Sequence, residues 1–279
     1  MSKPKRVLLV VLFGFLLYIV IGIFYPLTVE HYSIQDPNLP SAFDGFKILQ
    51  FSDLHCARYG DNQSQLIKIA KEEAPDVIFF TGDMVDSLIR DVEPALELLN
   101  GIKDIAPVFA VSGNHEDALH SVYDKEMLPQ LTAAGMIDFD NRTTIFTRDG
   151  QNIRLCGVTN PISMNDKISI AGFQKNIESV NFDDTYNILL FHRADVLEYF
   201  NGKHFNLIFT GHNHGGQIVL PFVGGLISGG RKWFPKYTSG VYDLEPGMQA
   251  IVSRGLGNPR GVIRVYASPD VVSVTLHST

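Results

Sequence analysis

The sequence has little cysteine and no excess of basic residues. Two cysteines, Cys56 and Cys156, stand in 279 residues, too few for a disulfide framework; one bridge between them remains an alternative to two free thiols. Lys and Arg number 23 against 30 Asp and Glu, a formal net charge of −7, which argues against non-specific binding of nucleic acid. Low-complexity tracts and internal repeats are absent, so the chain is expected to form one large domain, with or without an appendage.

One long hydrophobic run is present near the amino terminus. Residues 7–25 carry no charge and would form a helix about 28 Å long, close to the thickness of a bilayer core. Lys3, Lys5 and Arg6 precede the run, and no Lys or Arg follows it before Lys47. By the positive-inside rule, this asymmetry places the amino terminus in the cytoplasm and the rest of the chain outside.

The hydrophobic run suggests a division of the chain into three parts. Residues 1–28 are predicted to be a cytoplasmic tail and transmembrane anchor, 29–45 a polar linker, and 46–279 the globular domain. The protein is then expected in the cell membrane, with a single span and an extracytoplasmic domain. A cleaved signal peptide is the rival interpretation, although no Ala-x-Ala pattern follows the run.

Alternating apolar and polar segments predict an α/β fold. Apolar strands over 46–51, 77–80 and 107–111 each end in a polar tip and are followed by a helical segment, which indicates parallel strands joined by crossover helices. Further strands follow, of which 143–147 and 152–158 have the signal of a hairpin and the last four are short and mainly of antiparallel type. They are expected over 143–147, 152–158, 187–191, 207–210, 217–220, 240–244, 249–253 and 271–277. Two packed sheets with outer helices are the simplest architecture.

Metal-binding side chains follow five of these strands. Asp83 ends the second strand, and its two carboxylate oxygens could hold two cations at once. Residues two apart in an extended segment face the same side, so Asp53 and His55 can both point into one cavity. Oxygen and imidazole donors together suit Mn²⁺, Fe²⁺ or Zn²⁺ rather than Ca²⁺. The candidate site residues are Asp53, His55, Asp83, Asp86, Asn114, His115, His192, His212 and His214.

Five short motifs carry a resemblance to a known family. They are Asp53-x-His55, Gly82-Asp83-x-x-Asp86, Gly113-Asn114-His115-Glu116, His192 and Gly211-His212-x-His214. Their composition and order resemble the motif set of the calcineurin-like metallophosphoesterases. Later segments, among them Lys236-Tyr237 and Ser253-Arg-Gly-Leu-Gly257, are similar to a bacterial membrane-associated branch, the phosphodiesterases of the YkuE/YaeI type.

The resemblance implies a four-layer α-β-β-α sandwich that holds two divalent metal ions. The implied activity is hydrolysis of phosphate esters, specifically phosphodiesters, by hydroxide that bridges the ions. His115 would be the general acid, oriented by Asp86. The implied ligands are Asp53, His55 and His214 for one ion, Asn114, His192 and His212 for the other, and Asp83 for both.

Two positions depart from related patterns. Protein Ser/Thr phosphatases of this superfamily have Arg directly after the second Asp of the Gly-Asp-x-x-Asp motif, where this chain has Ser87, and this argues against that activity. After His192 the branch usually has Pro before Asp, whereas this chain has Arg193-Ala194-Asp195, which indicates a different local loop.

The expected substrate is a phosphate ester. An apolar segment over 219–237 would form either an apolar lip near the site or core under a long loop, and a lip that faces the bilayer would suit a substrate from the cell envelope or linked to a lipid. Candidate contacts for its phosphate are Arg58, Arg193, Arg231 and Lys232, with solvated surface charge as the alternative. Rival functions are a non-catalytic scaffold, a nuclease, and a cytoplasm-facing hydrolase of a nucleotide-linked lipid precursor. The sequence identifies neither the metals nor the oligomeric state.

Overall fold

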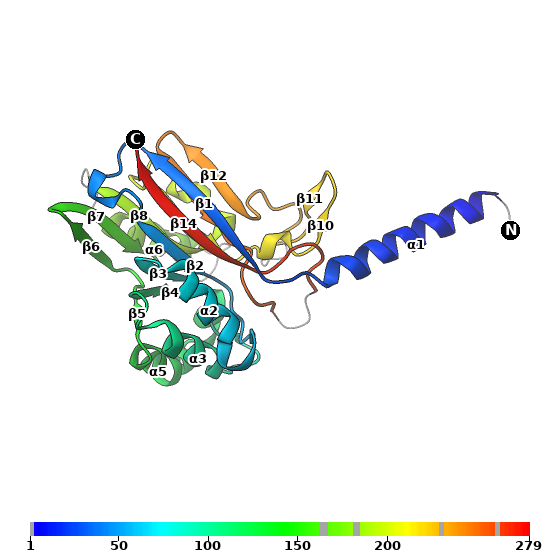
Figure 1. Cartoon of the computed structure of the whole chain (residues 1–279), viewed down its shortest axis with the longest axis horizontal. Coiled ribbons are helices and arrows are strands. Elements are labelled where there is room, and N and C mark those ends of the chain that lie inside the picture. The colour runs from blue at the N-terminus through cyan, green and yellow to red at the C-terminus, as the bar shows by residue number, and fades with distance from the viewer. Residues whose placement is uncertain (1–2, 162–166, 181–184, 229–231, 260–262) are drawn as a thin grey trace.

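Two six-stranded sheets pack face to face, and one long helix projects from the body that they form (Figure 1). The computed structural model describes residues 3–161, 167–180, 185–228, 232–259 and 263–279. Its helices are α1 (Lys3–Ile23), α2 (Ser64–Glu73), α3 (Glu93–Ile102), α4 (Asn114–Leu119), α5 (Leu128–Ala133) and α6 (Lys167–Ser179). Shorter helical turns are a π turn at Tyr123–Met127 and 3₁₀ turns at Ser41–Phe43, Asp61–Gln63, Ala194–Phe200 and His214–Gly216.

The first sheet has the strand order β1-β14-β2-β3-β4-β5. Its strands are β1 (Thr28–Asp36), β2 (Lys47–Phe51), β3 (Val77–Thr81), β4 (Val108–Val111), β5 (Met136–Asp138) and β14 (Asp270–Ser278). Strands β2 to β5 run parallel, whereas β14 pairs antiparallel with β2 and parallel with β1. All residues of β3 are buried, as expected for a β-branched and aromatic strand covered on both faces.

The second sheet has the order β12-β13-β9-β8-β7-β6. Its strands are β6 (Thr143–Arg148), β7 (Gln151–Gly157), β8 (Tyr186–Arg193), β9 (Leu207–Gly211), β12 (Gly240–Glu245) and β13 (Met248–Val252). The four central strands are parallel, and β6 and β12 add an antiparallel strand at each edge. A separate hairpin consists of β10 (Val219–Leu220) and β11 (Gly224–Gly225).

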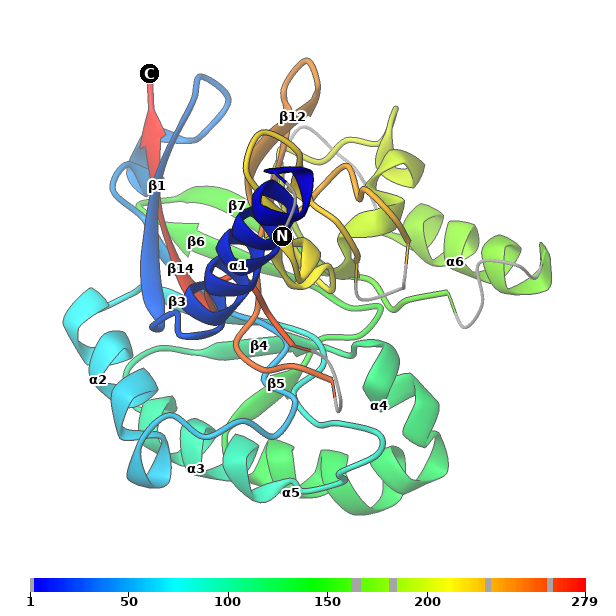
Figure 2. The same ribbon diagram turned by 90° about the vertical axis from the view of Figure 1, so that its right-hand side faces the viewer.

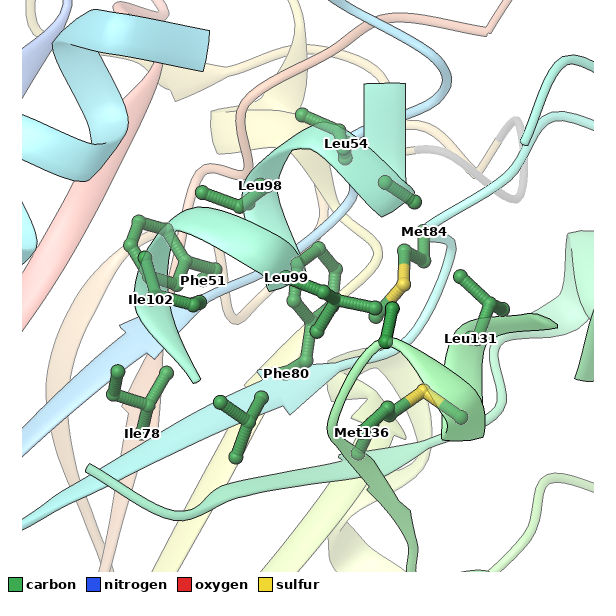
Figure 3. Close-up of a cluster of buried hydrophobic side chains, with 14 of the residues drawn as sticks. Phe51, Leu54, Ile78, Phe80, Met84, Leu98, Leu99, Ile102, Leu131 and Met136 are labelled. Atoms are coloured by element: carbon green, nitrogen blue, oxygen red, sulfur yellow. The ribbon is translucent and has the colours of Figure 1, made fainter. Parts of the chain in front are cut away.

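A first hydrophobic core joins helices α2, α3 and α5 to the outer face of the first sheet (Figure 3). In α3, Leu98 and Ile102 are spaced by four residues and therefore share the buried face of the helix. A second core fills the space between the sheets. There Phe79 of β3 meets Phe209 of β9 edge to face, with ring centroids 5.1 Å apart.

A third core covers the outer face of the second sheet. Phe173 of α6 packs on Phe191 of β8 and on Phe200 of the following turn. The three cores separate four layers in the order helix, sheet, sheet, helix, which confirms the predicted α-β-β-α sandwich. Cys156 is buried in this third core, and both Cys156 and Cys56 are free thiols.

The structure corrects the linker predicted over 29–45. Strand β1 occupies Thr28–Asp36 and pairs with β14 along its whole length, and the side chains of Ile34 and Leu39 enter the core between the sheets. Strand β1 is half exposed, so its residues are mostly polar and their composition resembles that of a solvated linker.

Helix α1 leaves the body at the end of the first sheet, and most of its side chains are exposed (Figure 1). Among the described residues, α1 is the helix long and apolar enough to span a membrane, a property that a signal sequence would share. Its last turns contact the body. The Tyr18 hydroxyl donates to the Val219 carbonyl at 2.6 Å, and the Tyr266 N–H donates to the Gly22 carbonyl at 2.9 Å.

Replacing Phe209 with Ala should lower the free energy of unfolding by about 3–5 kcal/mol, because the cavity would lie between two rigid sheets. Urea denaturation of the full chain in detergent measures the loss. Ile145→Ala, on an exposed position of β6, is the control and should change stability by less than about 0.5 kcal/mol. Equal losses in the two variants would show that the sheets are not tightly packed there.

Candidate metal centre

Polar side chains from five strands meet at one edge of the two sheets. Strands β3 and β4 of the first sheet face β8 and β9 of the second, so the residues at their carboxyl ends project into the same space. The structure brings together all seven side chains that the sequence suggested as ligands: Asp53, His55, Asp83, Asn114, His192, His212 and His214.

The carboxylate of Asp83 lies between two groups of donors. Its Oδ2 atom is 3.5 Å from His55 Nε2 and 3.3 Å from His192 Nε2. In the first group, Asp53 Oδ1 lies 3.9 Å from His55 Nε2 and 3.6 Å from His214 Nε2. One oxygen atom is therefore adjacent to both groups.

The second group is built around His192. Its Nε2 atom lies 3.1 Å from His212 Nδ1 and 3.1 Å from Asn114 Oδ1. Its Nδ1 atom is 2.8 Å from the Thr81 carbonyl, which turns Nε2 toward the other donors. Ligands about 2.0–2.2 Å from one ion are roughly 3 Å apart or slightly more, so the spacing of each group fits one first-row cation.

The donors are buried, and two of them, His55 and His212, have a ring nitrogen without a hydrogen bond among the described residues. His55 Nε2 is inaccessible and has no hydrogen bond among the described residues, which costs about 1–3 kcal/mol for a polar atom. A cation at this position would remove the deficit. Carboxylate, amide and imidazole donors without a thiolate suit Mn²⁺, Fe²⁺ or Zn²⁺. The residues present therefore fit a divalent metal.

The backbone is strained at the same place. Left-handed φ angles of 50°, 46°, 51°, 70° and 47° occur at Asp53, His55, Asp83, His212 and His214. Each such non-glycine residue costs on the order of 1–3 kcal/mol, and strain of this kind is concentrated at functional sites. The structure also shows why two motif positions are glycine. A Cβ at Gly113 would overlap Asp83, and a Cβ at Gly211 would overlap Asp53.

Glu116 supports Asp83 from behind, a role that the sequence did not reveal. Its carboxylate accepts hydrogen bonds from the backbone N–H groups of Asp83 and Val85, both at 2.9 Å, and of Gly113 at 2.7 Å. Burial, together with the Asp83 charge, raises the pKa of Glu116 to about 7. Its presence in the Gly-Asn-His-Glu motif was the signal available in the sequence.

Arg264 is a second residue that the sequence did not reveal. Its Nη2 atom lies 3.0 Å from His214 Nδ1 and donates to the Gly257 carbonyl, so that the guanidinium holds the His214 ring against the loop after β13. Burial and this guanidinium lower the pKa of His214 well below its usual value. Arg264 belongs to no recognised motif and meets His214 only through the fold.

His115 and Asp86, the predicted acid and its orienting carboxylate, lie side by side. His115 Nδ1 accepts the Ser87 N–H at 3.0 Å and is 3.5 Å from Asp86 Oδ2. Asp86 Oδ2 is also 3.3 Å from His55 Nδ1. The neutral His115 ring thus pairs with the Ser87 N–H, whereas an imidazolium would present its Nδ1 proton to Asp86.

The basic candidates for substrate binding differ in position. Arg193 and Lys232 both pair with Asp195, at 2.9 and 3.0 Å, and Asp195 Oδ1 is 3.9 Å from His212 Nε2. Arg58 is half exposed and pairs with Asp91 and Glu97 instead. Arg231 lies outside the described residues.

Comparison with known families agrees with this arrangement. The model of the calcineurin-like phosphoesterase family matches residues 46–216, which include all five motifs. The chain belongs to this family. It is therefore a metallophosphoesterase, and the resemblance seen in the motifs is confirmed.

Curated relatives extend the similarity over most of the chain. The chain is 32% identical to the uncharacterized metallophosphoesterase YkuE of Bacillus subtilis over 258 residues, 90% of this chain and 86% of the relative. It is 25% identical to the phosphodiesterase YaeI of Escherichia coli, covering 83% and 82% of the two chains. It is 26% identical to the UDP-2,3-diacylglucosamine pyrophosphatase LpxG of Chlamydia muridarum, covering 85% and 86%.

Metal binding should release protons and strengthen with pH. Burial lowers the pKa of His192, but the Asp83 carboxylate overrides this effect and the pKa rises to about 10. Below that pH a cation at Nε2 must displace a proton, so at least one proton should be released near pH 7 when the site that contains His192 is filled. Titration calorimetry with Mn²⁺ in two buffers of different ionisation enthalpy measures the number of protons released on metal binding. Affinity that is unchanged between about pH 6 and 8 would contradict the protonated His192.

Proposed function

We propose that the chain is a membrane-anchored phosphodiesterase that uses two divalent metal ions. The observation that carries the proposal is the position of Asp83 Oδ2 between His55 and His192, since a single shared oxygen lets two cations sit side by side. The proposed ligands are Asp53, His55 and His214 for one ion, Asn114, His192 and His212 for the other, and Asp83 for both.

The proposed chemistry needs an activated water and a proton donor. When bound, divalent cations would supply the activated water by lowering its pKa, and they would also offset charge on the phosphate oxygens. His115 is the proton donor, because its ring is partly exposed beside the metal-binding side chains and can deliver a proton to the departing oxygen. Asp86 would stabilise the imidazolium through Nδ1.

Two observations favour a diester over a phosphoprotein as substrate. Ser87 stands where Ser/Thr phosphatases of this superfamily have Arg, and its backbone N–H contacts the ring of His115. The relative YaeI is named a phosphodiesterase.

The proposed location is the cell membrane, anchored by α1. Lys3, Lys5 and Arg6 would lie in the cytoplasm and the domain outside. The first residues of the domain would then be those of β1.

A second candidate is hydrolysis of a nucleotide-linked lipid precursor, since the relative LpxG is named a UDP-2,3-diacylglucosamine pyrophosphatase. It requires the body to face the cytoplasm, where nucleotides are made. Incubating the Mn²⁺-loaded chain with an aryl phosphodiester and with a UDP-linked lipid separates the candidates by the ester that is cleaved. If neither compound is cleaved, the result would support the alternative that the protein is a non-catalytic scaffold.

Replacing Asp83 with Ala should remove both ions, because each loses its shared ligand. Elemental analysis of the purified full chain should show that the metal content falls from about two ions per chain to near zero. Asp149→Ala, in the turn between β6 and β7, is the matched control and should retain both. An Asp83→Ala chain that still holds two ions would exclude the bridging role.

Replacing His115 with Ala should leave the metal content unchanged but lower kcat on an alkyl phosphodiester by roughly 10²–10⁴-fold. An aryl diester, whose leaving group needs no proton, should be affected much less. His277→Ala, on the partly exposed end of β14, is the control for loss of an imidazole. Equal losses on both esters would refute the role of His115 as an acid.

A further inference from the structure

The register of the first sheet places the exit of α1 beside the metal centre. In the parallel pair β1–β14, Thr28 is opposite Asp270, and in the antiparallel pair β14–β2, Val272 is opposite Gln50. The start of β1 therefore lies at the carboxyl end of β2, which leads into Asp53. Because α1 ends only a few residues before β1, the proposed membrane span and the centre share one edge of the body.

Two loops of the body are fixed to the last turns of α1. Tyr18 binds the carbonyl of Val219 at the start of the β10–β11 hairpin, and Tyr266 contacts α1 through its N–H group and its ring. The Tyr25 and Tyr266 rings meet edge to face, 5.3 Å apart. Tyrosines are frequent at the level where a span leaves the bilayer. Both loops are thus held at the proposed membrane surface.

These loops expose large apolar side chains to solvent. The exposed fractions are 109%, 55%, 67%, 64% and 61% for Phe222, Val223, Trp233, Phe234 and Ile263, which we call the apolar rim. Figure 2 looks onto this edge and shows the segment that contains β10 and β11, in yellow, beside the base of α1. Apolar groups gathered in this way mark an interaction surface.

The charge of the same segment favours an anionic bilayer. Residues 219–242 contain Arg231, Lys232 and Lys236 and no Asp or Glu, although the chain as a whole is acidic. Lys232 and Lys236 flank Trp233 and Phe234 and are more than half exposed, although each also pairs with a carboxylate at 3.0 Å, Asp195 and Glu198 respectively. Basic residues beside aromatic ones are typical of segments that lie in the membrane interface.

A cavity of about 190 Å³ extends from the apolar rim to residues that neighbour the centre, although none of the seven donors lines it. Trp233, Phe234 and Lys232 line one part of it, and Asp195 and Asn213, which adjoin His212, line another. A phosphate group near the centre and an acyl chain at the rim could therefore belong to one molecule.

We propose that the apolar rim inserts into the surface of the bilayer that α1 spans, so that the metal centre opens onto the membrane and cleaves phosphate esters in lipid head groups. This inference rests on the proposed membrane anchor and phosphodiesterase activity. Lipid is the proposed binding partner of this surface, because the residues of the apolar rim lie next to α1 and have basic residues beside them.

Trp233 is the single tryptophan of the chain, so its fluorescence reports on the rim directly. The full chain is reconstituted in vesicles of phosphatidylcholine and phosphatidylglycerol, with brominated acyl chains in one preparation. Insertion predicts a blue-shifted emission that bromolipid quenches strongly and aqueous acrylamide quenches weakly. Emission that acrylamide quenches and bromolipid does not would overturn the proposal, and so would failure of the chain to float with the vesicles.

Phe222→Asp should weaken insertion by roughly tenfold, since a Phe side chain would no longer leave water. Quenching by bromolipid should fall, and hydrolysis of an acyl-linked aryl phosphodiester in the vesicles should fall about tenfold, with the soluble aryl phosphodiester unaffected. Ile145→Asp, on β6 at the side of the body far from α1 (Figure 1), is the control for an added charge and should change neither.

The two readouts separate this inference from the proposed function. If neither ester is hydrolysed, the proposed activity is wrong, while quenching of Trp233 still tests the rim. If the soluble ester is hydrolysed but Phe222→Asp alters neither quenching nor the preference for the acyl-linked ester, the rim does not bind lipid and the inference fails.

Discussion

The burial of Asp83 between two sheets is the constraint on which the centre depends. A carboxylate in the interior is unstable unless hydrogen bonds and opposite charge compensate it. The backbone N–H of His115 donates to Oδ1 at 2.8 Å, and Glu116 fixes the surrounding loops. Oδ2 faces His55 and His192, whose Nε2 atoms both lie within 3.5 Å of it. Two cations at this position would balance the carboxylates and satisfy the imidazoles together.

That arrangement needs a rigid support, which the fold provides through its central core. Phe79 and Phe209 pack across the sheets behind the site, and neighbouring strands are fixed by parallel hydrogen-bonded pairs. The strained backbone at the centre can persist because these strands position both ends of each short loop. Stability is therefore supplied by the apolar interior, whereas the strand ends are left free for chemistry.

Strand β1 links the candidate metal centre to α1, the proposed membrane span. Because β1 pairs with β14 and begins a few residues after α1, the orientation of the body relative to α1 is set by sheet register as well as by a short connection. The Arg254 guanidinium reinforces the link, donating to Thr28 Oγ1 at 2.9 Å and to the Glu30 carboxylate at 2.5 Å. An enzyme built in this way would present its centre to lipid head groups without a separate docking domain.

The sequence alone predicted the α/β class, the parallel crossover strands of the first sheet and the seven candidate donors, because these predictions depend on local periodicity and on polar residues at strand ends. It did not reveal β1, whose half-exposed residues resemble a linker until β14 pairs with them. Nor did it assign roles to Glu116 and Arg264, which contact Asp83 and His214 across 33 and 50 positions of the chain. Only the tertiary structure decided these contacts and the orientation of the centre toward α1, because sheet pairing brings together residues whose separation in sequence carries no signal.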